Sequence, residues 1–244
     1  GNRIPYFKGN PRNGVGYNFI KNIEVDVIIS VNYLFLIEND IINHSKQLTF
    51  NIHGSLLPKY RGRTPHVWAI INNEKKTGIT AHIIDEYCDA GNIISQIEIQ
   101  IDPFDTGNDI LNKFKMLYFS LITKVIEKLK SENIEFTKQD ENSATYFGIR
   151  KPEDGRINWN WQKERIINWV RAQANPYPGA FSYVNNQKLI IDKVEVCSLG
   201  FRFDIENGTV LAVTPSIVVK TTNGALEINK SRQKLKVKIG DIFI

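Results

Sequence analysis

The stretch FNIHGSLLPKYRGRTP, residues 50–65, places Asn51 and His53 two positions apart at the end of an apolar run. Residues two apart in a strand project to the same side, so we expect both side chains on one face. Open parallel sheets place their ligand crevice at the carboxyl end of the strands. An amide donor beside a proton carrier that titrates near neutral pH suits the tetrahedral intermediate of an acyl transfer.

A third candidate, Asp89, lies in the segment YCDAGN, in a tight loop that follows another expected strand. A carboxylate there could serve as the partner that a catalytic imidazole usually needs. No covalent nucleophile accompanies the set, because Ser55 has no GxSxG elbow and Cys88 has no signature around it. The set therefore suits direct transfer to an incoming amine. On spacing alone, a hydrogen-bonded structural histidine is the commoner interpretation.

The elements that must position these residues alternate between strands and helices, which predicts an α/β fold. Short apolar or alternating runs predict strands at 25–31, 48–54, 77–85 and 91–101, the first of them buried and parallel. Helices are expected at 16–24, from Thr64 with Pro65 in the first turn, and at 109–130. The last of these carries one apolar face: Ile110, Phe114, Leu117, Leu121, Val125 and Leu129.

From about residue 150 the pattern changes to a turn-rich connector, a helix over 163–175 that PYPG stops, and a series of short strands that runs to residue 244. We therefore expect a catalytic domain over 1–148, followed over 149–244 by a connector helix and a small β domain. Trp159, Trp161 and Trp169 fit core or interface positions, and His66 and His82 fit structural ones.

Composition narrows the class of protein. The 244 residues are 42% hydrophobic and include only two cysteines, Cys88 and Cys197, which predicts a globular cytoplasmic protein without a disulfide framework or a cysteine-built metal site. No apolar run has the length of a membrane span, so no membrane partner is expected. The net charge of +5 is weak evidence for nucleic acid, and Lys234, Lys236 and Lys238 alternate with apolar residues as on the wet face of a strand.

Several blocks in order carry a family resemblance: FNIHGSLLPKYRGRTPHVWAI, TGITAHIID, DAGNII, ATYFGIRKPEDGRINW and NWVRAQANPYPGAFSYV. Together they resemble the 10-formyltetrahydrofolate-dependent formyltransferases. Within these, the likeness is greatest to the sugar-nucleotide N-formyltransferases, including the formyltransferase domain of a bifunctional polymyxin-resistance enzyme. The resemblance implies a Rossmann-like domain and a small, mostly β C-terminal domain. Since the first strand and helix of the family precede the blocks found here, it also implies a catalytic domain that lacks them.

The resemblance also implies residue roles. Asn51 would polarise the formyl oxygen, His53 would be general base and proton donor, and Asp89 would raise the basicity of that histidine. The folate would lie against backbone groups in 35–37, near Arg63 and along the loop from Asp85, with no metal involved. The cofactor residues implied are Phe35, Leu36, Ile37, Arg63, Asp85, Glu86, Tyr87 and Cys88.

The acceptor implied is a dTDP- or UDP-linked amino sugar, formylated for surface polysaccharide or O-antigen synthesis by a homodimer. Basic groups could face its diphosphate and a ring could stack on it, although each residue fits a surface turn equally well. The candidates are Lys59, Tyr60, Arg61, Asn175 and Tyr177. Two alternatives stay open. One is a methionyl-tRNA formyltransferase, which the modest basic excess of the tail disfavours. The other is a non-catalytic protein that binds folate or a nucleotide.

Overall fold

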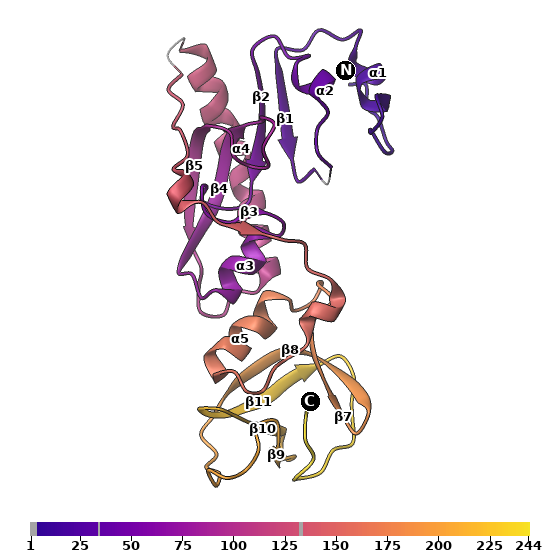
Figure 1. The fold of residues 1–244 in the computed structure, drawn as a ribbon, viewed down its shortest axis with the longest axis vertical. Coiled ribbons are helices and arrows are strands. Elements are labelled where there is room, and N and C mark those ends of the chain that lie inside the picture. Colours follow the sequence, from indigo (N-terminus) through magenta and orange to yellow (C-terminus); the bar gives the residue numbers. More distant parts are fainter. Residues whose placement is uncertain (1–3, 34, 132–133) are drawn as a thin grey trace. The chain divides into compact units, whose positions relative to one another are not determined.

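The structure is a computed structural model that describes residues 4–33, 35–131 and 134–244 (Figure 1). Its internal contacts divide the chain into two compact units. Within the described residues, the first comprises those up to 61 together with 78–97 and 117–145. The second comprises 62–77, 98–116 and 146–244.

A four-stranded sheet, in the order β1-β2-β4-β5, supports the first unit. β1 runs parallel to β2, and β2 runs antiparallel to β4, so the sheet is mixed. The strands are those expected from the sequence: β1 (Val27–Val31), β2 (Leu48–His53), β4 (Lys76–Ile83) and β5 (Ile93–Gln100). β1 is less buried than we expected. Within the described residues it has β2 as its one neighbour, and Ile29 is 37% exposed.

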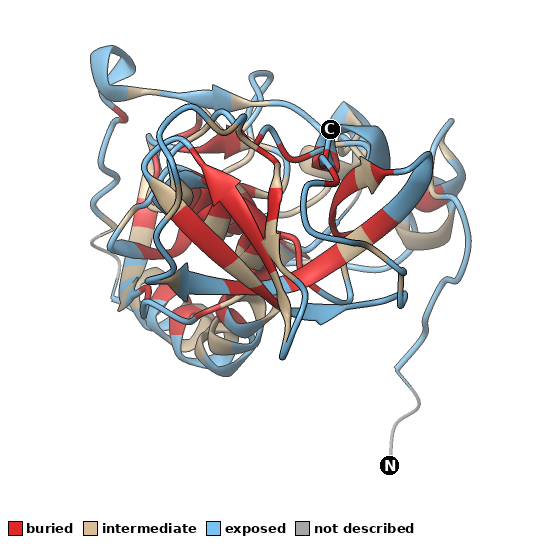
Figure 2. Cartoon of the chain, turned by 90° about the horizontal axis from the view of Figure 1, so that it is seen from below, coloured by how far each residue is buried: buried red, intermediate tan, exposed pale blue. Residues whose placement is uncertain are grey.

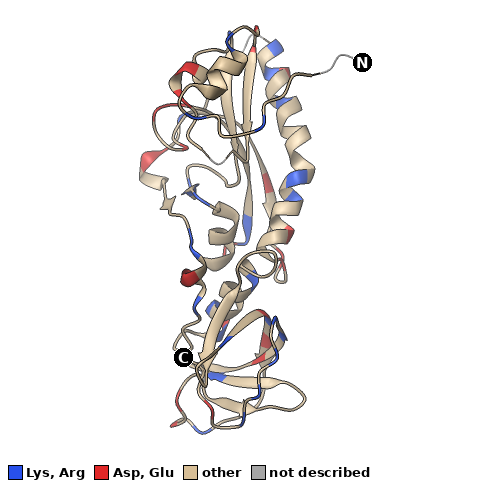
Figure 3. Cartoon of the chain, turned by 90° about the vertical axis from the view of Figure 1, so that its right-hand side faces the viewer, with Lys and Arg blue, Asp and Glu red and all other residues tan. Residues whose placement is uncertain are grey.

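The first four helices along the chain are α1 (Val15–Ile20), α2 (Asn39–Ile42), α3 (Pro65–Ile71) and α4 (Gly107–Lys130). α3 begins after Thr64 with Pro65 at its first position, as expected, because the fixed φ of proline suits a helix start. The apolar face predicted for α4 is confirmed. Its buried members are Ile110, Phe114, Leu121 and Val125. Lysines lie at intervals along α4 (Figure 3).

The C-terminal part of the second unit contains α5 (Lys163–Ala172) and an antiparallel sheet in the order β7-β8-β11-β10-β9. Its strands are β7 (Ala180–Val184), β8 (Gln187–Cys197), β9 (Val210–Ala212), β10 (Ile217–Thr221) and β11 (Gly224–Ser231). The fold expected from the sequence, an α/β domain followed by a small β domain, is therefore confirmed. Buried residues concentrate on the strands in Figure 2.

The expected strand at the C-terminus is wrong. Residues 234–244 form no strand, and their ladder contact is the isolated bridge between Ile242 and Thr209. A turn interrupts this segment. Gly240 has a φ of 91°, and the Asp241 carboxylate accepts a hydrogen bond from the backbone N–H of Lys238 at 3.0 Å. The alternation of lysines and apolar residues at 234–238 therefore belongs to an exposed irregular segment and not to a β-strand.

Short elements complete the chain: β3 (Arg61–Gly62), which pairs with β6 (Tyr146–Phe147), and the 3₁₀ turns η1 (Glu141–Ser143) and η2 (Pro152–Gly155). Three residues around β3 adopt the left-handed backbone conformation: Tyr60, Gly62 and Thr64. None of the helices formed by the described residues is both long and apolar enough to cross a membrane.

Candidate active site

The registry between β2 and β4 brings Asn51 and His82 together. The two residues are directly opposite in the antiparallel pair, where side chains on one face touch. The Asn51 amide Nδ2 lies 3.2 Å from His82 Nε2, and His82 Nδ1 lies 2.9 Å from the carbonyl oxygen of Ile83. Since a carbonyl only accepts, His82 Nδ1 carries a proton. In the neutral ring Nε2 is then an acceptor for Asn51, which fixes the direction of the amide.

His53 is oriented by the backbone. Its Nε2 donates to the carbonyl oxygen of Tyr60 at 2.8 Å, so Nδ1 is the nitrogen left to exchange a proton. We expected Asp89 to orient this ring. The structure instead gives that role to the main-chain carbonyl of Tyr60, at the end of the turn that precedes β3, and places the Asp89 carboxylate beside Nδ1.

The Asp89 carboxylate lies between two imidazoles. Its Oδ1 is 3.5 Å from His53 Nδ1 and 3.5 Å from His82 Nε2. All three side chains are largely buried, with exposed fractions of 7% for His53, 3% for His82 and 13% for Asp89. Asn51, His53 and Asp89, singled out from the sequence, thus lie in one cluster together with a second histidine.

Burial governs the protonation of His53. Removal from water lowers the pKa of His53 below its ordinary 6.5, and this effect outweighs the opposing influences of the Asp89 carboxylate and the Tyr60 carbonyl. The neighbouring His82 lowers the pKa further. His53 is therefore neutral at pH 7 and can accept a proton, while Asp89 stabilises the imidazolium that results.

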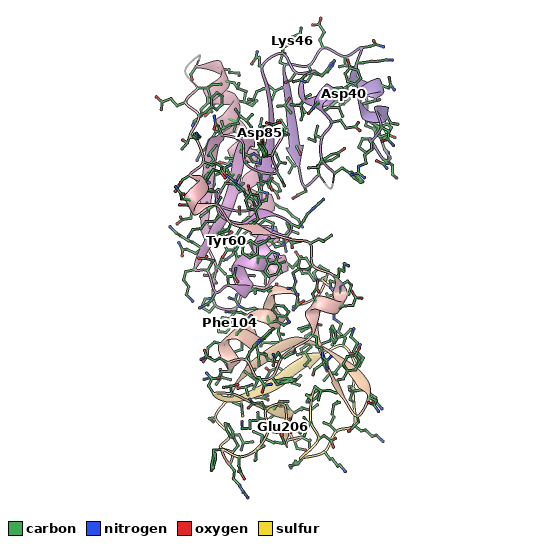
Figure 4. All side chains as sticks on the ribbon, viewed as in Figure 1. Asp40, Lys46, Tyr60, Asp85, Phe104 and Glu206 are labelled. Atoms are coloured by element: carbon green, nitrogen blue, oxygen red, sulfur yellow. The ribbon has the colours of Figure 1, made fainter. Side chains whose placement is uncertain are left out.

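The exposed loop of residues 85–88 leads into this cluster. Asp85, Glu86, Tyr87 and Cys88 are all exposed, whereas the next carboxylate, Asp89, is largely buried. The Asp85 side chain accepts a hydrogen bond from the backbone N–H of Tyr87 at 3.0 Å, which shapes the loop. Figure 4 labels Asp85 among the side chains of this unit.

The other residues expected to hold the folate lie in loops. Residues 35–37 stand outside helices and strands between β1 and α2, with the Leu36 side chain 73% exposed. Arg63, in the second unit, is exposed, and its backbone N–H donates to the carbonyl oxygen of Phe147 at 2.9 Å.

Two residues that we expected to contact the acceptor have buried side chains instead. Arg61 is 0% exposed, and its guanidinium is engaged by Gln139 and Glu141. Tyr60 is 8% exposed, and its contribution to the cluster is its backbone carbonyl. Neither can face a diphosphate or stack on a sugar, because the side chain is covered by protein. Lys59 is exposed and remains a candidate.

In the second unit, Asn175 is exposed and its backbone N–H donates to Asp192 at 3.0 Å. The Tyr177 hydroxyl lies 2.7 Å from His66 Nε2, and burial raises the pKa of Tyr177 to about 12. His66 is thus a partner of the NPYPG turn. Trp159 and Trp169 are buried, as expected for core aromatics.

Two participants in the cluster have no signal in the sequence alone. The sequence predicts a structural role for His82, because the registry that places it opposite Asn51 is not visible in either strand alone. Gln139, far along the chain, donates to the carbonyl oxygens of Asp89 and Gly91 at 2.9 and 2.7 Å. No motif or periodicity marks it.

Comparisons with known proteins identify the family of this chain. Residues 17–126 match the model of the formyl transferase family, and residues 150–243 match its C-terminal domain. The chain belongs to the formyl transferase family of enzymes.

Among solved structures, this chain is similar to WlaRD, a sugar 3N-formyl transferase solved in the presence of dTDP and 5-N-formyl-THF. Identity is 27%, the TM-score is 0.66, and the match covers 86% of this chain and 73% of WlaRD. It is also similar to the N-formyltransferase from Helicobacter canadensis, solved with folinic acid and dTDP-3-aminofucose. Identity is 26%, the TM-score is 0.63, and the match covers 83% of this chain and 72% of that one.

HypX from Aquifex aeolicus, solved with tetrahydrofolic acid, shares the fold. Identity is 21%, the TM-score is 0.65, and the match covers 90% of this chain. This chain spans only 37% of the length of HypX.

Proposed function

We propose that this protein transfers the formyl group of 10-formyltetrahydrofolate to the amine of a nucleotide-linked amino sugar. The observation that carries the proposal is the buried cluster of Asn51, His53 and Asp89, in which a neutral imidazole has its free nitrogen beside a carboxylate. The folate- and dTDP-containing complexes of two relatives that are 26–27% identical support the choice of donor and acceptor.

The segments at 35–37 and 85–88 suit the binding of the formyl donor, 10-formyltetrahydrofolate. The loop at 85–88 is exposed and ends at the buried carboxylate, and the segment at 35–37 offers main-chain groups outside any helix or strand. When bound, 10-formyltetrahydrofolate supplies an activated formyl carbon and then leaves as tetrahydrofolate. The proposed folate contacts are Phe35, Leu36, Ile37, Arg63, Asp85, Glu86, Tyr87 and Cys88.

The residues of the cluster divide the chemistry among them. As the bond from the amine nitrogen to the formyl carbon forms, Asn51 donates to the oxygen that becomes negative, which is worth about 10²–10³-fold in rate for such donors. His53 Nδ1 accepts the proton that the amine loses, and Asp89 stabilises the imidazolium. When the bond to the folate nitrogen breaks, His53 returns the proton to that nitrogen, so charge and protons balance.

For the acceptor, we propose contacts from the exposed Lys59 and Asn175 and from Tyr177, while the buried Tyr60 and Arg61 side chains are excluded. A lysine ammonium suits a diphosphate as a point charge. We also propose that the cytoplasmic enzyme works as a homodimer, that residues 1–148 form its catalytic domain, and that its product serves surface polysaccharide synthesis.

The test incubates the protein with 10-formyltetrahydrofolate and a panel of dTDP- and UDP-linked amino sugars, with methionyl-tRNA as a separate acceptor, and follows the acceptors by mass spectrometry. We expect one nucleotide sugar to gain a single CO unit. Formylation of methionyl-tRNA alone would identify a different acceptor class. Folate binding without any formylated product would indicate a non-catalytic binding protein.

A further inference from the structure

The Gln139 side-chain amide forms hydrogen bonds both to the buried guanidinium of Arg61 and to the loop that carries Asp89. Its Nε2 donates to the carbonyl oxygens of Asp89 and Gly91 at 2.9 and 2.7 Å. Its Oε1 accepts from Arg61 Nε and Nη2 at 3.0 and 2.8 Å. A primary amide has two N–H donors and two acceptor lone pairs, so all four are used. The residue is 4% exposed.

Arg61 fixes the direction of that amide. Its guanidinium is 0% exposed. Nη1 donates to Glu141 Oε2 at 3.0 Å, and Nη2, which also donates to Gln139, donates to Glu141 Oε1 at 2.7 Å. A buried charge without partners is costly, so this arrangement holds the guanidinium in place. Because a guanidinium only donates, it turns the amide oxygen of Gln139 toward itself and the amide nitrogen toward the loop.

The loop at 89–91 has a conformation that needs such support. Asp89 has a φ of 55°, a left-handed backbone that costs a residue with a side chain about 1–3 kcal/mol unless its surroundings impose it. At Gly91 an added Cβ would collide with the carbonyl oxygen of Ile83. The Asp89 carboxylate must nevertheless stay 3.5 Å from His53 Nδ1. The two hydrogen bonds from Gln139 act on the very backbone that sets this distance.

We propose that Gln139, held by Arg61, is a positioning residue for formyl transfer that acts through Asp89. The inference rests on the proposed function. It predicts a specific form of coupling between the two residues. Loss of the hydrogen bonds from Gln139 to the loop at 89–91 lowers kcat only in a protein that still has the Asp89 carboxylate to position. A role in stability alone would lower the rate regardless of the residue at 89.

The test is a double-mutant cycle with Gln139→Glu and Asp89→Asn. A carboxylate at 139 still accepts from Arg61 but cannot donate to the two carbonyls. We expect Gln139→Glu to lower kcat about 10- to 100-fold, the effect of a misplacement of about 1 Å, with KM for the acceptor changed less than about twofold. In the Asp89→Asn background the same change should alter kcat by less than about twofold.

Two further variants keep the test decisive. Gln47→Glu makes the same charge change at an exposed position of the same unit and should leave kcat unchanged. Glu141→Gln removes the ion pair that helps to hold Arg61. Because the Glu141 side chain is 64% exposed, this variant tests the Arg61–Gln139 arrangement with little risk to folding. It should lower kcat in the same direction, and again only when Asp89 is present.

Multiplicative losses in the double variants, or wild-type kcat in both Gln139→Glu and Glu141→Gln, would overturn the inference while leaving the proposed function standing. A wild-type protein that forms no formylated product with any acceptor would overturn the proposed function, and the inference with it.

Discussion

At the scale of single residues, the chemistry depends on the Nδ1 of His53. Its partner nitrogen is tied to the Tyr60 carbonyl, and burial keeps the ring neutral at pH 7. In a serine-protease triad the carboxylate orients the histidine ring. Here the Tyr60 carbonyl orients the ring, and the carboxylate of Asp89 stabilises the positive charge that the ring acquires.

Asp89→Asn tests this assignment through pH. Loss of the carboxylate removes an influence that raises the pKa of His53, so the pKa falls further below 6.5. The acid limb of kcat/KM should accordingly move to lower pH while the maximal rate drops about 10²-fold or more, the usual contribution of acid-base groups. The measurement is a pH profile of formyl transfer for both proteins. An unchanged limb and rate would remove Asp89 from the mechanism.

His82→Leu tests the second histidine. Leucine fills similar space but accepts nothing from Asn51, so the amide loses its fixed direction. One neutral hydrogen bond is worth about 0.5–1.5 kcal/mol, which corresponds to a fall in kcat of up to about tenfold. The kinetic assay should show this loss with KM for folate unchanged. A loss confined to KM would instead make His82 a binding residue.

At the scale of elements, three residues at and around β3, Tyr60, Gly62 and Thr64, adopt a backbone conformation that most residues avoid. Gly62 has a φ of 98°, and an added Cβ would collide with the carbonyl oxygen of Phe147. Gly62→Ala should therefore lower the free energy of unfolding by about 1–3 kcal/mol, measured by urea denaturation. Gly148→Ala is the matched control, because a Cβ there meets open space. Equal stability of the two variants would contradict this account of Gly62.

The elements also show what sequence can reveal. Asn51 and His53 could be paired because the period of a strand is two, and Asp89 because it follows a strand in a tight loop. Cross-strand registry, which brings His82 to Asn51, depends on two segments at once and has no local signature. Arg61 looked like a loop cation, because a sequence does not show that Gln139 and Glu141 return to cover it. At the C-terminus, alternation suggested a strand, but the turn at Gly240 prevents a ladder.

At the scale of the whole molecule, ligand binding should stabilise the folded chain. A ligand that binds only the native state at about 100 times its Kd adds about 2.7 kcal/mol, so folinic acid should raise Tm by several degrees. His53→Ala should show the same shift, because the proposed folate contacts lie in the loops at 35–37 and 85–88. Differential scanning fluorimetry measures both. An absent shift in the wild type would contradict the folate site, and its loss only in the variant would give His53 a binding role.

The central claim is that the cluster of Asn51, His53 and Asp89 performs formyl transfer to a sugar amine. The most direct test is single-turnover transfer from 10-formyltetrahydrofolate to the nucleotide amino sugar that the acceptor panel identifies, run with wild type and His53→Ala at equal folate occupancy. The account predicts formylated sugar from the wild type and a rate lower by at least about 10²-fold from the variant. Equal single-turnover rates would contradict it.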